Sequence, residues 1–358
     1  MKCRTIAVLA IAGTTVAACG YDRQWSSGKI ELSCGPFAWT PDASAVGFHD
    51  HDRRELVRIS RGKRVEVSDT ACATGAASVV AISPDGRHAV AWGDESTGGW
   101  HSGRHTVASC VVAFGPREAR PLGAAAESVL ADARDARDLA RLSSTGMVVA
   151  PAWQGIVFAH MDGGSATWVT LPPAGDPELF VDPIQPWVRC IHVSAVGNEV
   201  IAVCAVDKDN PDLIGVARVQ FSPPSVLQAR VVHVPVPVGL TTMSRVAVSR
   251  DGAKVVVLTG GDSPTTLLRI VVDTGAIELV QPLEIEGDAW DVAVAPSDAA
   301  LIGSKNVGAD EPVHFTHLAA DGRLVGRSRA AESVGKLAWD GGKSFWISGC
   351  DARRMPVP

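Results

Sequence analysis

The stretch VAISPDGRHAVAWG, from Val80 to Gly93, decides the fold of this chain. Apolar residues at alternating positions precede Pro84-Asp85-Gly86, and a second alternating run follows it. Alternation of this kind is typical of half-buried strands, and Pro-Asp-Gly is a tight-turn sequence. The stretch therefore predicts a β-hairpin. Because one hairpin is at best marginally stable alone, it also predicts that further copies pack beside it.

Six more copies of the pattern occur along the chain. They begin at Pro36, Ala140, Ile191, Arg245, Asp291 and Leu337, and the position of Ser83 is taken by Thr40, Ser143, Ser194, Ser249, Ala295 and Asp340. The copies are 43 to 60 residues apart, which leaves room for two further strands after each hairpin. Seven units of four antiparallel strands predict an all-β fold, a seven-bladed β-propeller. Little chain follows the last hairpin, so we expect Lys29 to Leu32 to supply an outer strand and close the ring.

Three of the turns carry a family resemblance. SPDGR at Ser83–Arg87, SRDGAK at Ser249–Lys254 and TPDAS at Thr40–Ser44 resemble the WD40-like repeats of the TolB-like family of periplasmic propellers. The resemblance implies a single propeller domain over residues 33–358. One helix is expected, from Ala124 to Arg137, as an exposed insertion entering the third blade.

The N-terminus has the pattern of a secretory signal. Lys2 and Arg4 precede a short apolar run, and small residues precede Cys19. The string VAAC at Val16–Cys19 resembles the bacterial lipobox, which implies a signal peptide over residues 1–18, a lipid on Cys19 and a tether over residues 19–32. We therefore expect an extracytoplasmic, membrane-anchored lipoprotein, and Gly20 after the cysteine favours the outer membrane of a Gram-negative cell. The alternative is an ordinary signal peptide followed by a chance cysteine.

Six cysteines remain beyond this segment and would form up to three disulfides, with fifteen possible connectivities. Cys190 and Cys204 flank one hairpin turn almost symmetrically, so we expect them to be close enough to bridge. A Cys34–Cys350 bond would join the two ends of the repetitive region, and Cys72–Cys110 is then left by elimination. Spacing alone leaves other connectivities open for these last four.

Charge and loop composition suggest a binding face. The net charge is −6 with no basic stripe, which argues against a nucleic-acid partner. Acidic and histidine residues collect in the loops that follow the second strand of each repeat: His49, Asp50, His51, Asp52, Asp94, His101, His105, Asp207, Asp209 and Asp310. They predict an acidic face for a basic partner or a divalent cation. The alternative is that Asp simply serves as a turn former. No complete set of metal ligands is present, so no cofactor is predicted.

Strand alternation points to a second site. At the position of Ala81 most copies have alanine, but the third and fourth have Arg141 and His192. Two residues earlier, later copies carry Arg245, Asp291 and Lys336. On the innermost strands these five side chains would converge on the central channel. They would bind an anionic molecule or perform acid–base chemistry, with His192 titrating near neutrality. The alternative is an ion-pair network between blades.

The usual catalytic strings, a GxSxG elbow, a Walker loop and HExxH, do not occur. The sequence therefore favours a lipid-anchored scaffold of the cell envelope that binds another envelope protein. The alternative function is a hydrolase resembling lactonases that acts on a small anionic substrate through the channel residues.

Overall fold

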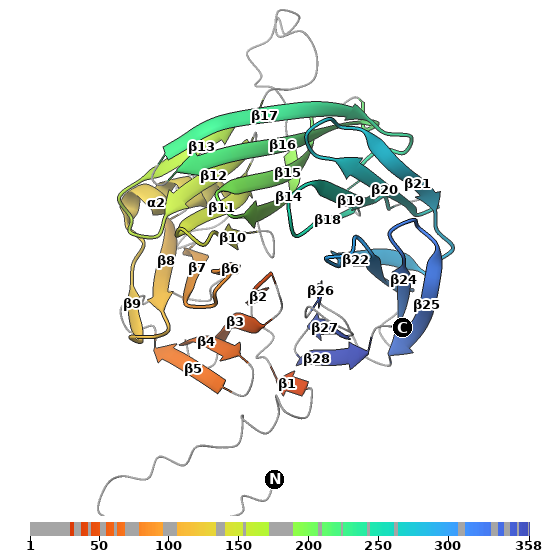
Figure 1. Cartoon of the computed structure of the whole chain (residues 1–358). Coiled ribbons are helices and arrows are strands. Elements are labelled where there is room, and N and C mark those ends of the chain that lie inside the picture. The colour runs from red at the N-terminus through yellow and green to blue at the C-terminus, as the bar shows by residue number, and fades with distance from the viewer. Residues whose placement is uncertain are drawn as a thin grey trace, which may run out of the picture.

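The structure is a computed structural model, in which residues 29–31, 37–41, 44–50, 55–60, 63–68, 79–95, 106–133, 140–152, 155–171, 189–206, 210–222, 225–241, 244–260, 264–306, 312–330, 336–339, 344–348, 351–356 and 358 are described. These residues form antiparallel four-stranded sheets that stand around a common centre (Figure 1). The predicted all-β propeller is thereby confirmed.

Six sheets each consist of four consecutive strands, with the first strand innermost. Blade 1 contains β2 (Phe37–Trp39), β3 (Ala45–Asp50), β4 (Glu55–Ser60) and β5 (Lys63–Ser68). Blade 2 contains β6 (Val79–Ile82), β7 (His88–Glu95), β8 (Thr106–Ala113) and β9 (Glu118–Arg120). Blade 3 contains β10 (Arg141–Leu142), β11 (Met147–Ala152), β12 (Gly155–His160) and β13 (Ala166–Thr170).

The next three blades follow the same order. Blade 4 contains β14 (Arg189–Val196), β15 (Glu199–Ala205), β16 (Leu213–Ser222) and β17 (Ser225–Pro235). Blade 5 contains β18 (Arg245–Val248), β19 (Lys254–Leu258), β20 (Thr266–Val271) and β21 (Ile277–Pro282). Blade 6 contains β22 (Asp288–Val294), β23 (Ala300–Lys305), β24 (Val313–Leu318) and β25 (Leu324–Ala330).

A further four-stranded sheet, blade 7, combines the two ends of the described chain. It contains β26 (Lys336–Trp339), β27 (Ser344–Ser348), β28 (Asp351–Pro356) and β1 (Lys29–Glu31). β1 lies antiparallel to β28, with Lys29 opposite Arg353. The outermost strand of this sheet thus comes from the N-terminal side of the described residues.

The hydrophobic core lies between the faces of neighbouring blades. Between blades 3 and 4, the rings of Phe158 and Phe221 have centroids 6.2 Å apart, and both side chains are buried. Each blade has two apolar faces because its residues alternate between neighbours, which explains why the inner and middle strands are apolar at almost every position.

The predicted helix exists, and one of its faces is buried. It consists of α2 (Ala124–Leu130) and the 3₁₀ turn η1 (Ala131–Ala133), and it contacts β8, β12 and β13. Ala126 and Leu130 are buried in the cluster between blades 2 and 3. Glu127 accepts hydrogen bonds from the backbone N–H and the hydroxyl of Ser109. Ala124, Ala125 and Ser128 are exposed as expected, and the expectation of exposure was wrong for the face that carries Ala126 and Leu130, because small alanines do not form a recognisable apolar stripe. No helix among the described residues has the length and apolarity to cross a membrane.

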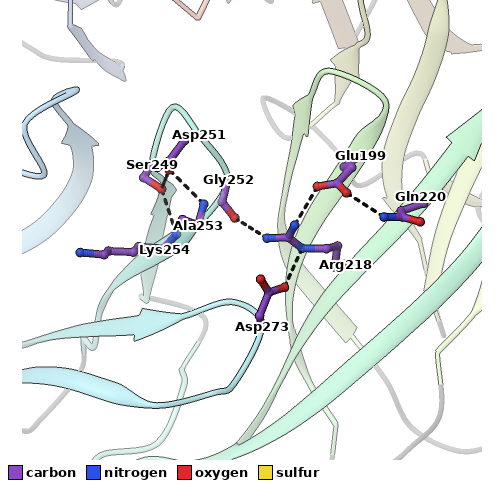
Figure 2. A network of polar contacts seen from close by, with 9 residues as sticks. All are labelled: Glu199, Arg218, Gln220, Ser249, Asp251, Gly252, Ala253, Lys254 and Asp273. Atoms are coloured by element: carbon purple, nitrogen blue, oxygen red, sulfur yellow. Dashed lines mark hydrogen bonds and ion pairs between the residues drawn. The ribbon is translucent and has the colours of Figure 1, made fainter.

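The hairpin turns are held by a recurring hydrogen-bond pattern. The Ser83 hydroxyl donates to Asp85 Oδ1 at 2.6 Å and accepts from the His88 N–H at 2.9 Å. The Ser249 hydroxyl donates to Asp251 Oδ1 at 2.7 Å, as Figure 2 shows for that turn. The repeated Ser-x-Asp-Gly sequence thus forms a closed turn from residues that are all local.

We expect Ser83→Ala to lower the free energy of unfolding by about 1 to 2 kcal/mol, because it removes the hydrogen bonds of the hydroxyl to Asp85 and to the backbone of His88. Urea unfolding followed by fluorescence measures this. Ser83→Thr is the control: it keeps the hydroxyl, as Thr40 does in blade 1, where its oxygen accepts from the Ala45 N–H at 3.0 Å. Equal losses in the two variants would contradict the prediction.

Arginines on the third strands join each of three blades to the next. Arg218 of β16 donates to the carbonyl oxygen of Gly252, in the turn of blade 5, at 3.1 Å (Figure 2). The same guanidinium contacts Glu199 at 3.0 Å and Asp273 at 3.1 Å. One side chain therefore connects two strands of its own blade to two turns of the following blade.

The same contact recurs at two other blade boundaries. Arg58 of β4 donates to the carbonyl oxygen of Gly86 at 2.7 Å, and Arg269 of β20 donates to that of Asp298 at 2.8 Å. The acceptor residues occupy equivalent turn positions with positive φ, at 66°, 71° and 63° for Gly86, Gly252 and Asp298. This conformation turns the carbonyl toward the neighbouring blade. The sequence reasoning missed these arginines, although an alignment of the third strands places them in register.

Candidate functional site

The five channel residues predicted from the sequence lie on innermost strands of five successive blades: Arg141 (β10), His192 (β14), Arg245 (β18), Asp291 (β22) and Lys336 (β26). We call them the axial cluster. These strands surround the centre of the ring (Figure 1). His192 is 9% exposed, and the other four side chains are half-buried. Four members of the cluster therefore remain accessible to solvent.

Two of the innermost strands carry a β-bulge, and these are the strands of His192 and Asp291. The register of β14 against β15 shifts between Cys190 and His192. The register of β22 against β23 shifts between Ala289 and Asp291, so Trp290 is the extra residue. Among the described innermost strands, no other pairing with a second strand shows such a shift. A bulge bends the strand and redirects the following side chain, and bulges are frequent next to functional sites.

Trp290 has room because it packs on a glycine. A Cβ added at Gly303 would lie 2.9 Å from the indole Nε1 of Trp290. The neighbouring Asp291 accepts a hydrogen bond from the backbone N–H of Leu337, in blade 7, at 2.5 Å. The bulge thus directs the Asp291 carboxylate across the boundary between blades 6 and 7.

The two arginines of the axial cluster are also held by backbone atoms. Arg245 Nε donates to the carbonyl oxygen of Trp290, in the next blade, at 2.5 Å, and its NH1 donates to Ser244 O at 2.9 Å. Arg141 NH1 donates to Ala140 O at 2.8 Å. These hydrogen bonds to carbonyl oxygens orient the two guanidinium groups.

His192 is held neutral. Burial is the main reason that its pKa lies well below the ordinary histidine value, and the positive charges of Arg141 and Lys336 lower that pKa further. β14 and β26 lie on opposite sides of the ring centre (Figure 1), so the influence of Lys336 on His192 acts across the centre. The expectation that His192 titrates near neutrality was wrong, because the sequence shows neither its burial nor its cationic neighbours.

Burial acts in the opposite direction on Asp291. Its pKa is raised by burial, although Lys336, the Leu337 N–H and Arg245 each stabilise the carboxylate and partly offset that rise. Lys336 therefore influences both His192 and Asp291, from a third blade. The structure brings the axial cluster into one electrostatic neighbourhood.

Of the predicted acidic binding face, His49 and Asp50 are described with their side chains. Both belong to β3 rather than to the loop after it, and they are 3% and 9% exposed. For these two residues the expected exposure was wrong, because β3 continues to Asp50. Asp94 lies in β7, and its side chain is outside the described part of the structure. The remaining members lie outside the described residues: His51, Asp52, His101, His105, Asp207, Asp209 and Asp310.

The predicted disulfide between Cys190 and Cys204 is present, joining β14 to β15. Cys110 is also a disulfide cysteine. Its predicted partner Cys72, the predicted pair Cys34 and Cys350, and the predicted lipid site Cys19 lie outside the described residues. Among the side chains that the structure does describe, no group of three or more His, Cys, Asp or Glu is placed to hold a metal ion.

Comparison with known proteins shows the fold. The chain is similar to Kuenenia stuttgartiensis hydrazine synthase, with a TM-score of 0.56 and 15% identity over 90% of this chain and 96% of that one. It is similar to the β-propeller domain of Myceliophteria thermophila Cps50 (Swd1), with a TM-score of 0.56 and 9% identity over 92% and 100%. It is also similar to a chain of the Mitotic Checkpoint Complex, with a TM-score of 0.55 and 10% identity over 100% of this chain and 99% of that one.

No family model and no curated protein matches this sequence. Structural likeness at 9 to 15% identity extends to the propeller architecture and not to a shared activity. The TolB-like family and the lipoprotein signal therefore remain predictions from the sequence.

Proposed function

We propose that this chain is a protein-binding scaffold of the bacterial cell envelope, held at a membrane by a lipid on Cys19. The proposal takes the propeller as a seven-bladed ring in which β1 pairs with β28 and completes blade 7. Propellers offer a broad, rigid surface on which loops and strand edges are displayed.

One observation carries the scaffold proposal: among the side chains that the structure describes, the large apolar ones that stay exposed lie on outermost strands. They belong to the outermost strands of blades 3 to 6: Trp168 (37% exposed), Leu227 (65%), Val280 (48%), Leu324 (46%) and Val325 (48%). We call them the outer apolar belt. Exposed apolar groups that gather in one region of a surface are typical of protein contacts.

The strand edges beside this belt are protected from open-ended pairing. Leu227 and Val325 are the extra residues of bulges in β17 and β25, where the register against the third strand shifts. Bulges on edge strands prevent indiscriminate edge-to-edge association. The apolar side chains are thus presented on edges that favour a specific contact over aggregation.

The lactonase-like alternative has weaker support. It requires a group that exchanges protons near neutral pH, and the lowered pKa of His192 makes its imidazole a weak base. The cationic side chains of the axial cluster suit binding better than proton transfer. Turnover of a compound in a panel of lactones and esters by the purified protein would favour the enzyme over the scaffold.

The scaffold is tested by site-specific photo-crosslinking in the native host. A photo-reactive residue at Leu227 is expected to give a discrete adduct with one envelope protein, and the same residue at Arg87, an exposed turn position on blade 2, is expected to give none. Absence of an adduct at Leu227, or the same adducts from both positions, would contradict the outer belt as the contact. Cys19→Ser tests the anchor separately, because it should move the chain from the membrane fraction to the soluble fraction.

A further inference from the structure

We propose that the axial cluster is a carboxylate-binding site at the centre of the ring. This inference concerns a different surface from the outer apolar belt and does not rest on the scaffold proposal. It rests on three observations at the innermost strands: the position of the axial cluster, the hydrogen bonds of its side chains and their charges.

Position is the first argument. Arg141, Arg245 and Lys336 are the first residues of β10, β18 and β26, so the three cations lie at the end of their strands that is away from the hairpin turns. His192 and Asp291 lie within β14 and β22. The half-buried side chains are accessible enough to meet a ligand and buried enough to be screened less than surface charges. Bulges directly precede His192 and Asp291, where uninterrupted strands would have sufficed for blade packing alone.

Charge is the second argument. Arg141, Arg245 and Lys336 each bring a positive charge, and within the axial cluster Asp291 is the one acid. The innermost strands also carry Asp288, which is exposed at the beginning of β22. The buried His192 stays neutral between two of the cations. The cluster therefore has an excess of positive charge next to a buried imidazole, and an anion is the ligand that such an arrangement attracts.

Donor chemistry narrows the anion to a carboxylate. Guanidinium groups form paired hydrogen bonds with the two oxygens of a carboxylate, and an ammonium adds a point charge. A neutral imidazole offers one N–H donor for a further oxygen. The backbone bonds of Arg141 and Arg245 fix the position from which each guanidinium group points, so less side-chain entropy is lost when a ligand arrives.

The test is calorimetric titration of the intact protein at low ionic strength with two probes, citrate and a hexaglutamate peptide. Wild-type protein is expected to bind at least one probe. The double variant Arg141→Gln/Lys336→Gln should weaken that binding at least tenfold. The control Arg230→Gln/Arg323→Gln, which removes the same charge from exposed positions, should change it less than twofold. Lys336→Arg, which keeps the charge, should also bind.

Each result has a defined meaning. Binding of citrate alone identifies a free small carboxylic acid as the type of ligand, and binding of the peptide alone identifies an acidic segment of another protein; either supports the site. If neither probe binds the wild type, or if the control variant loses as much affinity as the axial variant, the proposal is wrong. If the double variant has a lower melting temperature than the wild type, the single variant Lys336→Met provides the same comparison with a smaller change in charge.

Discussion

Replacing Arg269 with methionine is expected to lower the free energy of unfolding by about 3 kcal/mol, because two hydrogen bonds to a charged donor are lost together. Arg269 is 5% exposed and donates from blade 5 to the carbonyl oxygens of Asp298 and Ala320 in blade 6. The variant leaves both carbonyls without this donor, whereas methionine keeps most of the side-chain volume. Equilibrium urea unfolding at pH 7 measures the loss.

Arg230→Met is the matched control for Arg269→Met. Arg230 lies on the outermost strand β17 and is exposed, so its replacement should change the unfolding free energy by less than about 0.5 kcal/mol. Arg269→Lys adds a second comparison, since it retains the charge but not the two-pronged geometry, and it should fall between wild type and methionine. A methionine variant as stable as the control would show that the contact between blades contributes little.

Acidification should destabilise the protein through His192. Its pKa is lowered in the folded state, so the unfolded state binds the proton first, at a pKa of about 6.5. The contribution of His192 to stability is therefore complete above that pH and falls as the pH decreases, until the folded pKa is passed. Between these two pKa values the loss from this one group is expected to grow by at most about 1.4 kcal/mol for each unit by which the pH falls.

Comparison with His192→Gln isolates this effect from the other titrating groups. The unfolding free energy of wild type and variant, measured between pH 7.5 and 5, should diverge below about pH 6.5, with the wild type losing more. Arg141 and Lys336 each lower the pKa of His192. We therefore expect that replacing either residue with a neutral one reduces the difference between the two stability curves. Parallel curves for wild type and His192→Gln would show that the imidazole is not held neutral by the fold.

Much of the architecture follows from short-range patterns. The Ser83 turn closes through hydrogen bonds within five residues, so the same letters predict the same turn wherever they recur. The Cys190–Cys204 disulfide was predictable for a similar reason, since the two residues lie directly opposite in one hairpin. The position of the helix in the sequence was predicted correctly, but its buried face was not, because small residues such as Ala126 reveal nothing of the surface against which they pack.

The sequence predicted which residues form the candidate site, but not their geometry. Alternation placed the axial cluster on innermost strands, but it did not reveal the extra residue Trp290 before Asp291, since an inserted strand residue leaves no distinct mark on composition. Nor did it reveal the burial that lowers the pKa of His192. His49 and Asp50 were expected in a loop for a related reason: the sequence does not mark the point at which β3 ends.

The sequence by itself determined the hairpin repeat, the alternation of its strands and the disulfide between Cys190 and Cys204, since each depends on residues within one hairpin. The tertiary structure alone decided which distant residues meet. Arg58, Arg218 and Arg269 donate to turns 28, 34 and 29 residues away, in the next blade. Lys336 influences His192 across the ring. These contacts depend on the accumulated twist and packing of several blades, a sum of small angles that no local pattern records.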